Sequence, residues 1–107
     1  MTTEQGRVLR DAGMAAADAV QPEQWRHHVD VVIGTFADSG DPFTSDDVSL
    51  LTGDSPTGSR GAMGARFQHA ARRGVIVRIG YTPSRRPSVH AHPVALWQGA
   101  QHVRGAA

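Results

Sequence analysis

Residues 63–81 read MGARFQHAARRGVIVRIGY, and the pattern of apolar residues changes at Gly74. Before this glycine, apolar residues recur at helical spacing, which predicts a helix with one inner face. That face consists of Met63, Phe67, Ala70 and Ala71. After the glycine, residues 75–82 are dense in β-branched and aromatic residues, which predicts a strand. Because glycine commonly follows the last residue of a helix, the stretch predicts a helix from about Ser59 to Arg72 and then a strand.

Glycines recur every third residue at the start of this helix, at Gly58, Gly61 and Gly64. Each of the last two weakens the helix by about 1 kcal/mol relative to alanine. We expect Gly64 to allow close packing on the preceding helix, and Gly58 and Gly61 to leave the first turn frayed. The glycines could instead let the backbone approach a phosphate group. Without a lysine, the stretch does not match a Walker loop.

A long helix is predicted upstream, after Pro22, which fits the first turn of a helix. Apolar residues fall on one of its faces at helical spacing. They are Trp25, Val29, Val32, Ile33 and Phe36. Residues 39–42, which read SGDP, end this helix.

A short helix is predicted between the long helix and the basic helix. Thr44 is a good N-cap, and we interpret Asp46-Asp47 as capping acids in the first turn rather than as a paired-carboxylate site. Val48 and Leu51 are expected on the inner face, and Gly53 closes the helix.

The two ends of the chain are expected to lie outside this domain. Residues 3–20 are rich in helix formers and carry a stripe of small apolar residues, which could pack on the domain or form a dimer seam. The stripe consists of Val8, Ala12, Ala15, Ala16 and Ala19. Residues 98–107 are small and polar, so we expect a flexible, frayed tail. The sequence therefore predicts an N-terminal helix over 1–21, a domain over 22–97 and a tail over 98–107.

A return strand is predicted from Val89 to Trp97, after a loop over residues 83–88. Pro93 within it argues for an edge strand or an interruption, because proline has no N–H for the ladder. The fold class expected is mainly α with a small β hairpin: about four helices and a two-stranded ribbon. The chain has six aromatic residues, each expected in the core: Trp25, Phe36, Phe43, Phe67, Tyr81 and Trp97.

Charge is separated along the chain. All ten acidic residues and three arginines precede Ser55, whereas the remainder carries eight arginines and no acidic residue. Every basic residue other than histidine is arginine, whose planar fork suits phosphate oxygens and guanine edges. A polyanion should be attracted to one part of the molecule and repelled by the other.

Bulk properties exclude several classes of protein. The chain of 107 residues has no cysteine, which excludes disulfides and thiolate metal sites. No apolar run approaches the roughly 20 residues of a membrane span, and the first residues lack the layout of a signal peptide. We expect a single domain in the cytoplasm with no membrane partner.

The order of elements resembles a winged helix-turn-helix domain over residues 22–97. In detail, residues 10–14 (RDAGM) and 86–97 (RPSVHAHPVALW) are similar to small proteins of actinobacteria and their phages that are labelled DNA-binding. The resemblance implies that residues 59–73 are the recognition helix and residues 75–97 the wing. The turn from Gly53 to Gly58 departs from the family, because it is longer than the three or four residues of a tight turn.

The resemblance implies a set of DNA-binding residues: Ser59, Arg60, Arg66, His69, Arg72, Arg73, Arg78, Arg85, Arg86 and His90. Arg60 and Arg66 lie toward the helix start, where contacts to bases are usual, and Arg72 and Arg73 are expected on phosphates. All four are expected away from the inner face. A solvated helix face is the alternative interpretation.

The pair Arg85-Arg86 lies at the tip of the implied wing between Pro83 and Pro87. The prolines stiffen the loop, so less entropy is lost when it enters a groove. Arginine can read a narrow minor groove by its shape. An ordinary solubilising loop is the alternative.

Other chemistry has little support. His90 and His92 would share a strand face and, with His69 or His102, could hold a metal. No nearby carboxylate or thiolate completes such a site, so we predict no metal and no cofactor. No serine or histidine has a recognisable nucleophile context, and we predict no enzyme.

Two functional hypotheses follow. The first is a non-enzymatic protein that binds double-stranded DNA, in transcription regulation or as a phage, replication or packaging accessory. The second is a protein-interaction module, for example a phage factor that binds or inhibits a host protein through the acidic first half. Winged helices serve both kinds of partner, and a homodimer is compatible with either.

Overall fold

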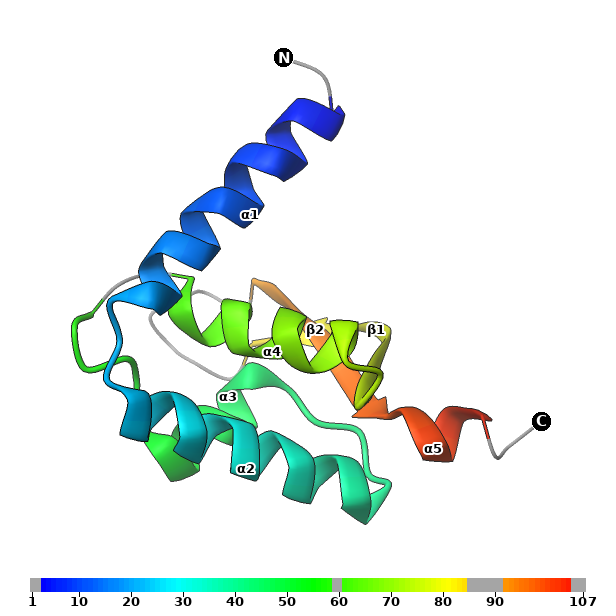
Figure 1. The fold of residues 1–107 in the computed structure, drawn as a ribbon. Coiled ribbons are helices and arrows are strands. Elements are labelled where there is room, and N and C mark those ends of the chain that lie inside the picture. The colour runs from blue at the N-terminus through cyan, green and yellow to red at the C-terminus, as the bar shows by residue number, and fades with distance from the viewer. Residues whose placement is uncertain (1–2, 59–60, 85–91, 105–107) are drawn as a thin grey trace.

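The computed structural model describes residues 3–58, 61–84 and 92–104. Within these residues the chain forms five helices and a two-stranded antiparallel sheet (Figure 1). In chain order the elements are α1 (Thr3–Ala19), α2 (Glu23–Ser39), α3 (Ser45–Thr52), α4 (Ala62–Arg72), β1 (Ile76–Pro83), β2 (Pro93–Gly99) and α5 (Ala100–Arg104). The prediction of a mainly α fold with a small β hairpin is therefore confirmed.

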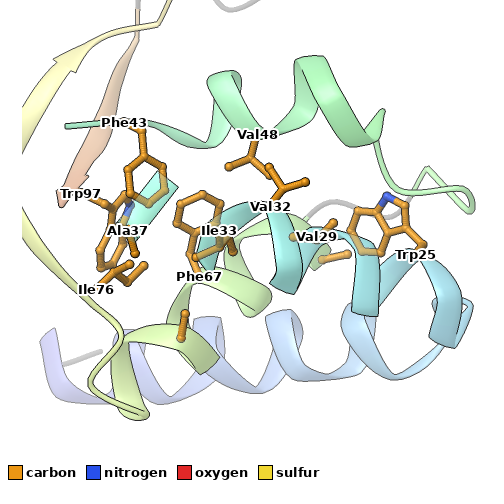
Figure 2. Packing of buried hydrophobic residues seen from close by; sticks show 12 residues of the cluster. Trp25, Val29, Val32, Ile33, Ala37, Phe43, Val48, Phe67, Ile76 and Trp97 are labelled. Carbon is orange, nitrogen blue, oxygen red and sulfur yellow. The ribbon is translucent and has the colours of Figure 1, made fainter. Parts of the chain in front are cut away.

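α2 supplies one long side of the core. Its predicted inner face is confirmed: Trp25, Val29, Val32 and Ile33 are buried, and Phe36 packs partly buried against them. In Figure 2, Trp25 lies at one end of the row of core side chains and Trp97 at the other. The core therefore runs along the length of α2.

Aromatic rings fill the end of the core near the sheet. The ring centroids of Phe36 and Phe43 are 5.0 Å apart, and those of Phe67 and Trp97 are 5.7 Å apart. Tyr81 is an exception, because it is 63% exposed. The expectation that every aromatic residue lies in the core is therefore wrong for Tyr81, which is exposed between the half-buried Gly80 and Thr82 and so faces away from the core.

α3 begins as predicted, but its inner face differs. The Thr44 hydroxyl accepts from the Asp47 N–H at 3.3 Å, and the Asp47 carboxylate accepts from the Thr44 N–H at 2.9 Å, which forms a capping box. Val48 is fully buried. Leu51 is 62% exposed, so its predicted inner position is wrong. Asp46 is buried instead and accepts a hydrogen bond from the Ser84 hydroxyl at 2.7 Å, which joins α3 to the end of the hairpin.

α4 begins later than predicted. Gly61 has φ 89°, a left-handed conformation that is not helical, so α4 starts at Ala62. The predicted inner face is confirmed, since Phe67 and Ala70 are buried and Met63 and Ala71 pack against the core.

The hairpin pairs from Ile76 opposite Gly99 to Pro83 opposite Pro93, with a register shift between Arg78 and Gly80. Pro93 opens β2, a position that proline tolerates. Residues 89–91 of the predicted return strand lie outside the described residues.

A third segment lies beside β2. Phe43 and Trp97 form an isolated antiparallel bridge in which the N–H of each residue donates to the carbonyl of the other at 2.8 Å. The link between α2 and α3 is thereby fixed to the hairpin.

α1 packs on α4, and its N-terminal end points away from the rest of the molecule (Figure 1). A Cβ on Gly61 would lie 3.2 Å from Met14 Cγ, and one on Gly64 would lie 3.1 Å from Met14 Cε. Both glycines therefore make room for Met14. The expectation that Gly64 packs on the preceding helix is therefore wrong. Gly58 and Gly61 both precede α4, which agrees with a first turn that does not form, and Gly61 has the further task of admitting Met14.

The small-residue stripe is not the face by which α1 packs. Ala12, Ala15, Ala16 and Ala19 are exposed, whereas Met14, Ala17 and Asp18 are half-buried. The side chain of Val8 lies outside the described set. The contact face is rotated from the stripe because Met14 and Asp18 have partners on α4.

The segment expected as a frayed tail is ordered through Arg104. A Cβ on Gly99 would overlap the carbonyl oxygen of Ala37, so β2 passes directly over the backbone of α2. Ala100 is buried, and its N–H donates to the Val75 carbonyl at 3.0 Å. The Gln98 amide donates to the Gly40 carbonyl at 2.6 Å. The prediction failed because backbone contacts, rather than large apolar side chains, hold this segment.

Candidate nucleic-acid interface

Arg66 does not lie on the outer face of α4. It is 4% exposed. Its Nε donates to Asp30 Oδ1 at 3.0 Å, and its Nη1 donates to Asp18 Oδ2 at 3.0 Å. The expectation that Arg66 faces solvent and contacts bases is therefore corrected, because its guanidinium is enclosed and paired with two carboxylates.

Arg26 completes this group, which we call the Arg66 cluster: Asp18, Arg26, Asp30 and Arg66. Arg26 Nη2 lies 3.3 Å from Asp18 Oδ2, and the Arg26 Nε is buried without a hydrogen-bond partner. The cluster joins α1, α2 and α4. It also pairs an arginine of the basic half with two aspartates of the acidic half, so the charge separation in the sequence is partly neutralised inside the fold.

Four other predicted residues lie on the outside and are called here the basic surface: His69, Arg72, Arg73 and Arg78. All four are exposed. His69 and Arg72 belong to the C-terminal end of α4, Arg73 is its C-cap, and Arg78 belongs to β1, the strand that follows. Among the ion pairs of the described residues, none includes these arginines. The Arg78 guanidinium lies over the Tyr81 ring, 5.4 Å from its centroid.

α1 covers the beginning of the outer face of α4. A cavity of about 160 Å³ separates the two helices. Its lining includes Met14, Ala15 and Asp18 of α1, and Ala65, Gln68, His69 and Arg72 of α4. His69 and Arg72 line this cavity and yet stay exposed, so an external partner can reach the C-terminal end of α4.

Half of the predicted DNA-binding set lies outside the described residues: Ser59, Arg60, Arg85, Arg86 and His90. His92 is described and exposed. Across residues 3–58, 61–84 and 92–104, no group of three or more histidine or acidic side chains could hold a metal ion.

Asp18 and Asp30 were missed as partners of Arg66, although one sequence signal pointed to the burial of this arginine. Ala62, Arg66 and Ala70 follow one another at intervals of four, and therefore share a stripe of the helix. Both alanines are buried.

None of the helices within the described residues is long and apolar enough to cross a membrane. Comparisons of the chain with protein-family models, with curated proteins and with solved structures found no match.

Proposed function

We propose that this protein binds double-stranded DNA without catalysing a reaction, and that the basic surface is where the phosphates lie. The observation that carries the proposal is the exposure of Arg72, Arg73 and Arg78 on two adjoining elements, with no ion pair to any of them among the described residues. Unpaired arginines in a half of the chain without acidic residues attract a polyanion.

The order of elements supports the same proposal. α2, the Phe43 bridge, α3, α4 and the hairpin follow the sequence of parts that is typical of a winged helix-turn-helix domain. In such domains the second helix of the pair and the hairpin approach one duplex together. α4 passes into β1 within a few residues, so their exposed arginines can reach neighbouring phosphates of one backbone.

The position of α1 and the burial of Arg66 bear on how DNA would be read. Contacts to bases usually come from the start of a recognition helix, which α1 covers here. The available arginines lie at the end of α4 and on β1. We therefore infer that phosphate contacts dominate and that sequence preference is weak. A regulator, or an accessory in replication or packaging, would fit such binding.

Salt dependence of binding to a mixed-sequence duplex tests the proposal. Each phosphate contact contributes a slope of about −0.9 in a plot of log affinity against log salt. The three described arginines alone contribute about −3, and contacts by Arg85 and Arg86 would make the slope steeper. Fluorescence anisotropy between about 50 and 200 mM salt measures this slope. A slope shallower than about −2 would remove duplex DNA as the main partner.

Matched variants test whether the salt slope comes from the arginines of the basic surface. Arg73→Ala should make the slope shallower by about 0.9, and Arg73→Lys should retain it, because lysine keeps the charge. Gln24→Glu, at an exposed position of α2, lowers the net charge by the same unit as Arg73→Ala. If Gln24→Glu weakens binding as much as Arg73→Ala does, net charge rather than the basic surface is responsible.

A further inference from the structure

A groove separates the second half of α2 from the end of α3, away from the basic surface. It encloses about 370 Å³. Its lining consists of Val32, Thr35, Phe36, Ser39, Asp41, Pro42 and Leu51. The central side chains are apolar, and one acidic residue stands at the rim. None of these residues belongs to the Arg66 cluster or to the basic surface.

Apolar side chains extend this groove onto the surface. Leu51, which lines it, is 62% exposed, and Val31, one turn before Thr35 on α2, is 51% exposed. Single exposed apolar residues are ordinary, but Leu51 and Val31 beside a groove lined by Val32 and Phe36 add to the apolar area that is favourable to remove from water.

The surroundings of the groove are acidic. Between His28 and Ser59 the chain has no arginine, lysine or histidine, and it has six aspartates. Three of them are engaged elsewhere, because Asp30 pairs with Arg66 and the carboxylates of Asp46 and Asp47 accept hydrogen bonds from Ser84 and Thr44. Asp41 lines the groove and is exposed, and Asp38 is exposed in the last turn of α2, next to its final residue. Neither α2 nor α3 has a basic residue in its last turn, and at the end of α2 the Nε2 of His102 lies 3.2 Å from the Asp38 carbonyl. The negative C-terminal end of α3 stays uncompensated by its own side chains.

We propose that this groove binds an amphipathic helix of a protein partner, with apolar anchors on one face and arginine or lysine at its borders. A cleft between two helices accepts the apolar face of a third helix. The acidic rim and the C-terminal end of α3 would attract basic residues that flank the anchors. From Val32 to Ser39 the groove follows roughly 10 Å of α2, which matches about two helical turns of the partner.

A second copy of this chain fits less well. Among the side chains that the structure describes, the exposed arginines lie at a helix end and on a strand, where Tyr81 and Ile79 are the large exposed apolar residues. A two-helix groove needs anchors at helical spacing, which that surface lacks. The proposal does not rest on DNA binding, because the groove and the basic surface share no residue.

Synthetic peptides of about 14 residues provide the probe, with three leucines at helical spacing. One peptide has arginines beside the leucines, and its matched partner has glutamates. Each peptide is titrated into the isotope-labelled protein while amide chemical shifts are recorded. The arginine peptide should shift the amide signals of Thr35, Ser39 and Leu51. The glutamate peptide should bind at least about tenfold more weakly. Equal binding of the two peptides, or shifts confined to other residues, would overturn the proposal.

Two neighbouring leucines give a matched pair of variants. Leu51→Gln should weaken the arginine peptide by about tenfold, whereas Leu50→Gln should change it by less than about twofold. Both residues are largely exposed, so thermal unfolding should show that both variants stay folded. If the two variants weaken peptide binding equally, the peptide does not bind in the groove.

Sedimentation and a duplex titration distinguish the remaining outcomes. The parent should sediment as a monomer at the concentration of the titration. A dimer that Leu51→Gln dissociates would assign the groove to a second copy and overturn the proposal. Duplex DNA should move amides of the basic surface and leave the groove unchanged. If the protein binds the arginine peptide but does not bind duplex DNA, the proposed function is wrong and the groove proposal stands.

Discussion

The Nε of Arg66 donates to Asp30 Oδ1 at 3.0 Å, across the contact between α4 and α2. Arg66 is almost fully enclosed, whereas the Asp30 side chain keeps 32% of its exposure. The pair therefore lies at the boundary of the core, where it holds two helices in one relative position. In such a pair, the enclosed partner depends on the other for its hydrogen bonds.

Arg66→Ala should destabilise the fold strongly. Breaking a buried ion pair costs about 3–5 kcal/mol, and the partial exposure of Asp18 and Asp30 lowers the expected cost to about 2–4 kcal/mol. Urea unfolding measures it. Arg73→Ala is the surface control and should stay within about 0.5 kcal/mol of the parent. If Arg66→Ala also lowers the free energy of unfolding by less than about 0.5 kcal/mol, the Arg66 cluster does not hold the helices together.

Asp18→Asn tests the coupling inside the Arg66 cluster. In a double-mutant cycle with Arg66→Ala, the two losses of stability should not add, since each substitution removes part of the same interaction. The non-additive part should be about 0.5–3 kcal/mol. Additive losses would show that Arg66 is stabilised by packing of its alkyl chain instead.

Gly99→Ala should destabilise the fold by several kcal/mol, because the new methyl group would overlap the Ala37 carbonyl and the backbone must shift. Gly80→Ala is the matched control in the facing strand, where nothing lies within 4 Å of the new atom. It should be neutral or stabilising by about 0.4–1 kcal/mol. Thermal unfolding measures the stability of both variants. Similar losses of stability would contradict the close packing of β2 on α2.

A disulfide between α1 and α4 tests whether α1 must move for DNA to bind. The chain has no cysteine, and a Cβ at Gly61 would lie 3.8 Å from Met14 Cβ, within the usual range for a disulfide. Met14→Cys with Gly61→Cys should oxidise readily, although the left-handed conformation costs about 1–2 kcal/mol. If the end of α4 and β1 bind DNA, the oxidised and reduced forms should bind equally. Loss of binding on oxidation alone would show that DNA displaces α1.

Arg85 and Arg86 lie outside the described residues, and their role remains a prediction from the sequence. Replacing both by alanine keeps the flanking prolines, so binding should weaken on all duplexes and the salt slope should become shallower by about 2. Replacing both by lysine is the control and should retain the slope. Binding unchanged by the alanine pair would exclude the hairpin tip as a DNA contact.

The parts of the fold that the sequence predicted are those with a local signal. The apolar spacing of α2, the capping residues of α3 and the change of pattern at Gly74 each depend on residues close together in the chain. These signals are short-range, and the structure confirms each of them.

The errors share a different cause. A charged residue is expected outside because lone buried charges are rare, so Arg66 was placed on the surface without its distant partners. Leu51 was placed inside because its spacing from Val48 is helical, yet the core ends before it. The tail after Trp97 is held by contacts of its backbone with α2 and β1, which side-chain patterns do not reveal. These features depend on tertiary contacts.

The backbone bridge between Phe43 and Trp97 also bears on how the molecule opens. Both amide protons are held between buried residues from distant parts of the chain. Local fraying of either segment cannot release them, so they should exchange with solvent deuterium only when the whole domain unfolds. The N-terminal turns of α1, which point away from the body, should exchange far sooner. Amide exchange should therefore be slowest where the helices join the hairpin and fastest in the first turns of α1.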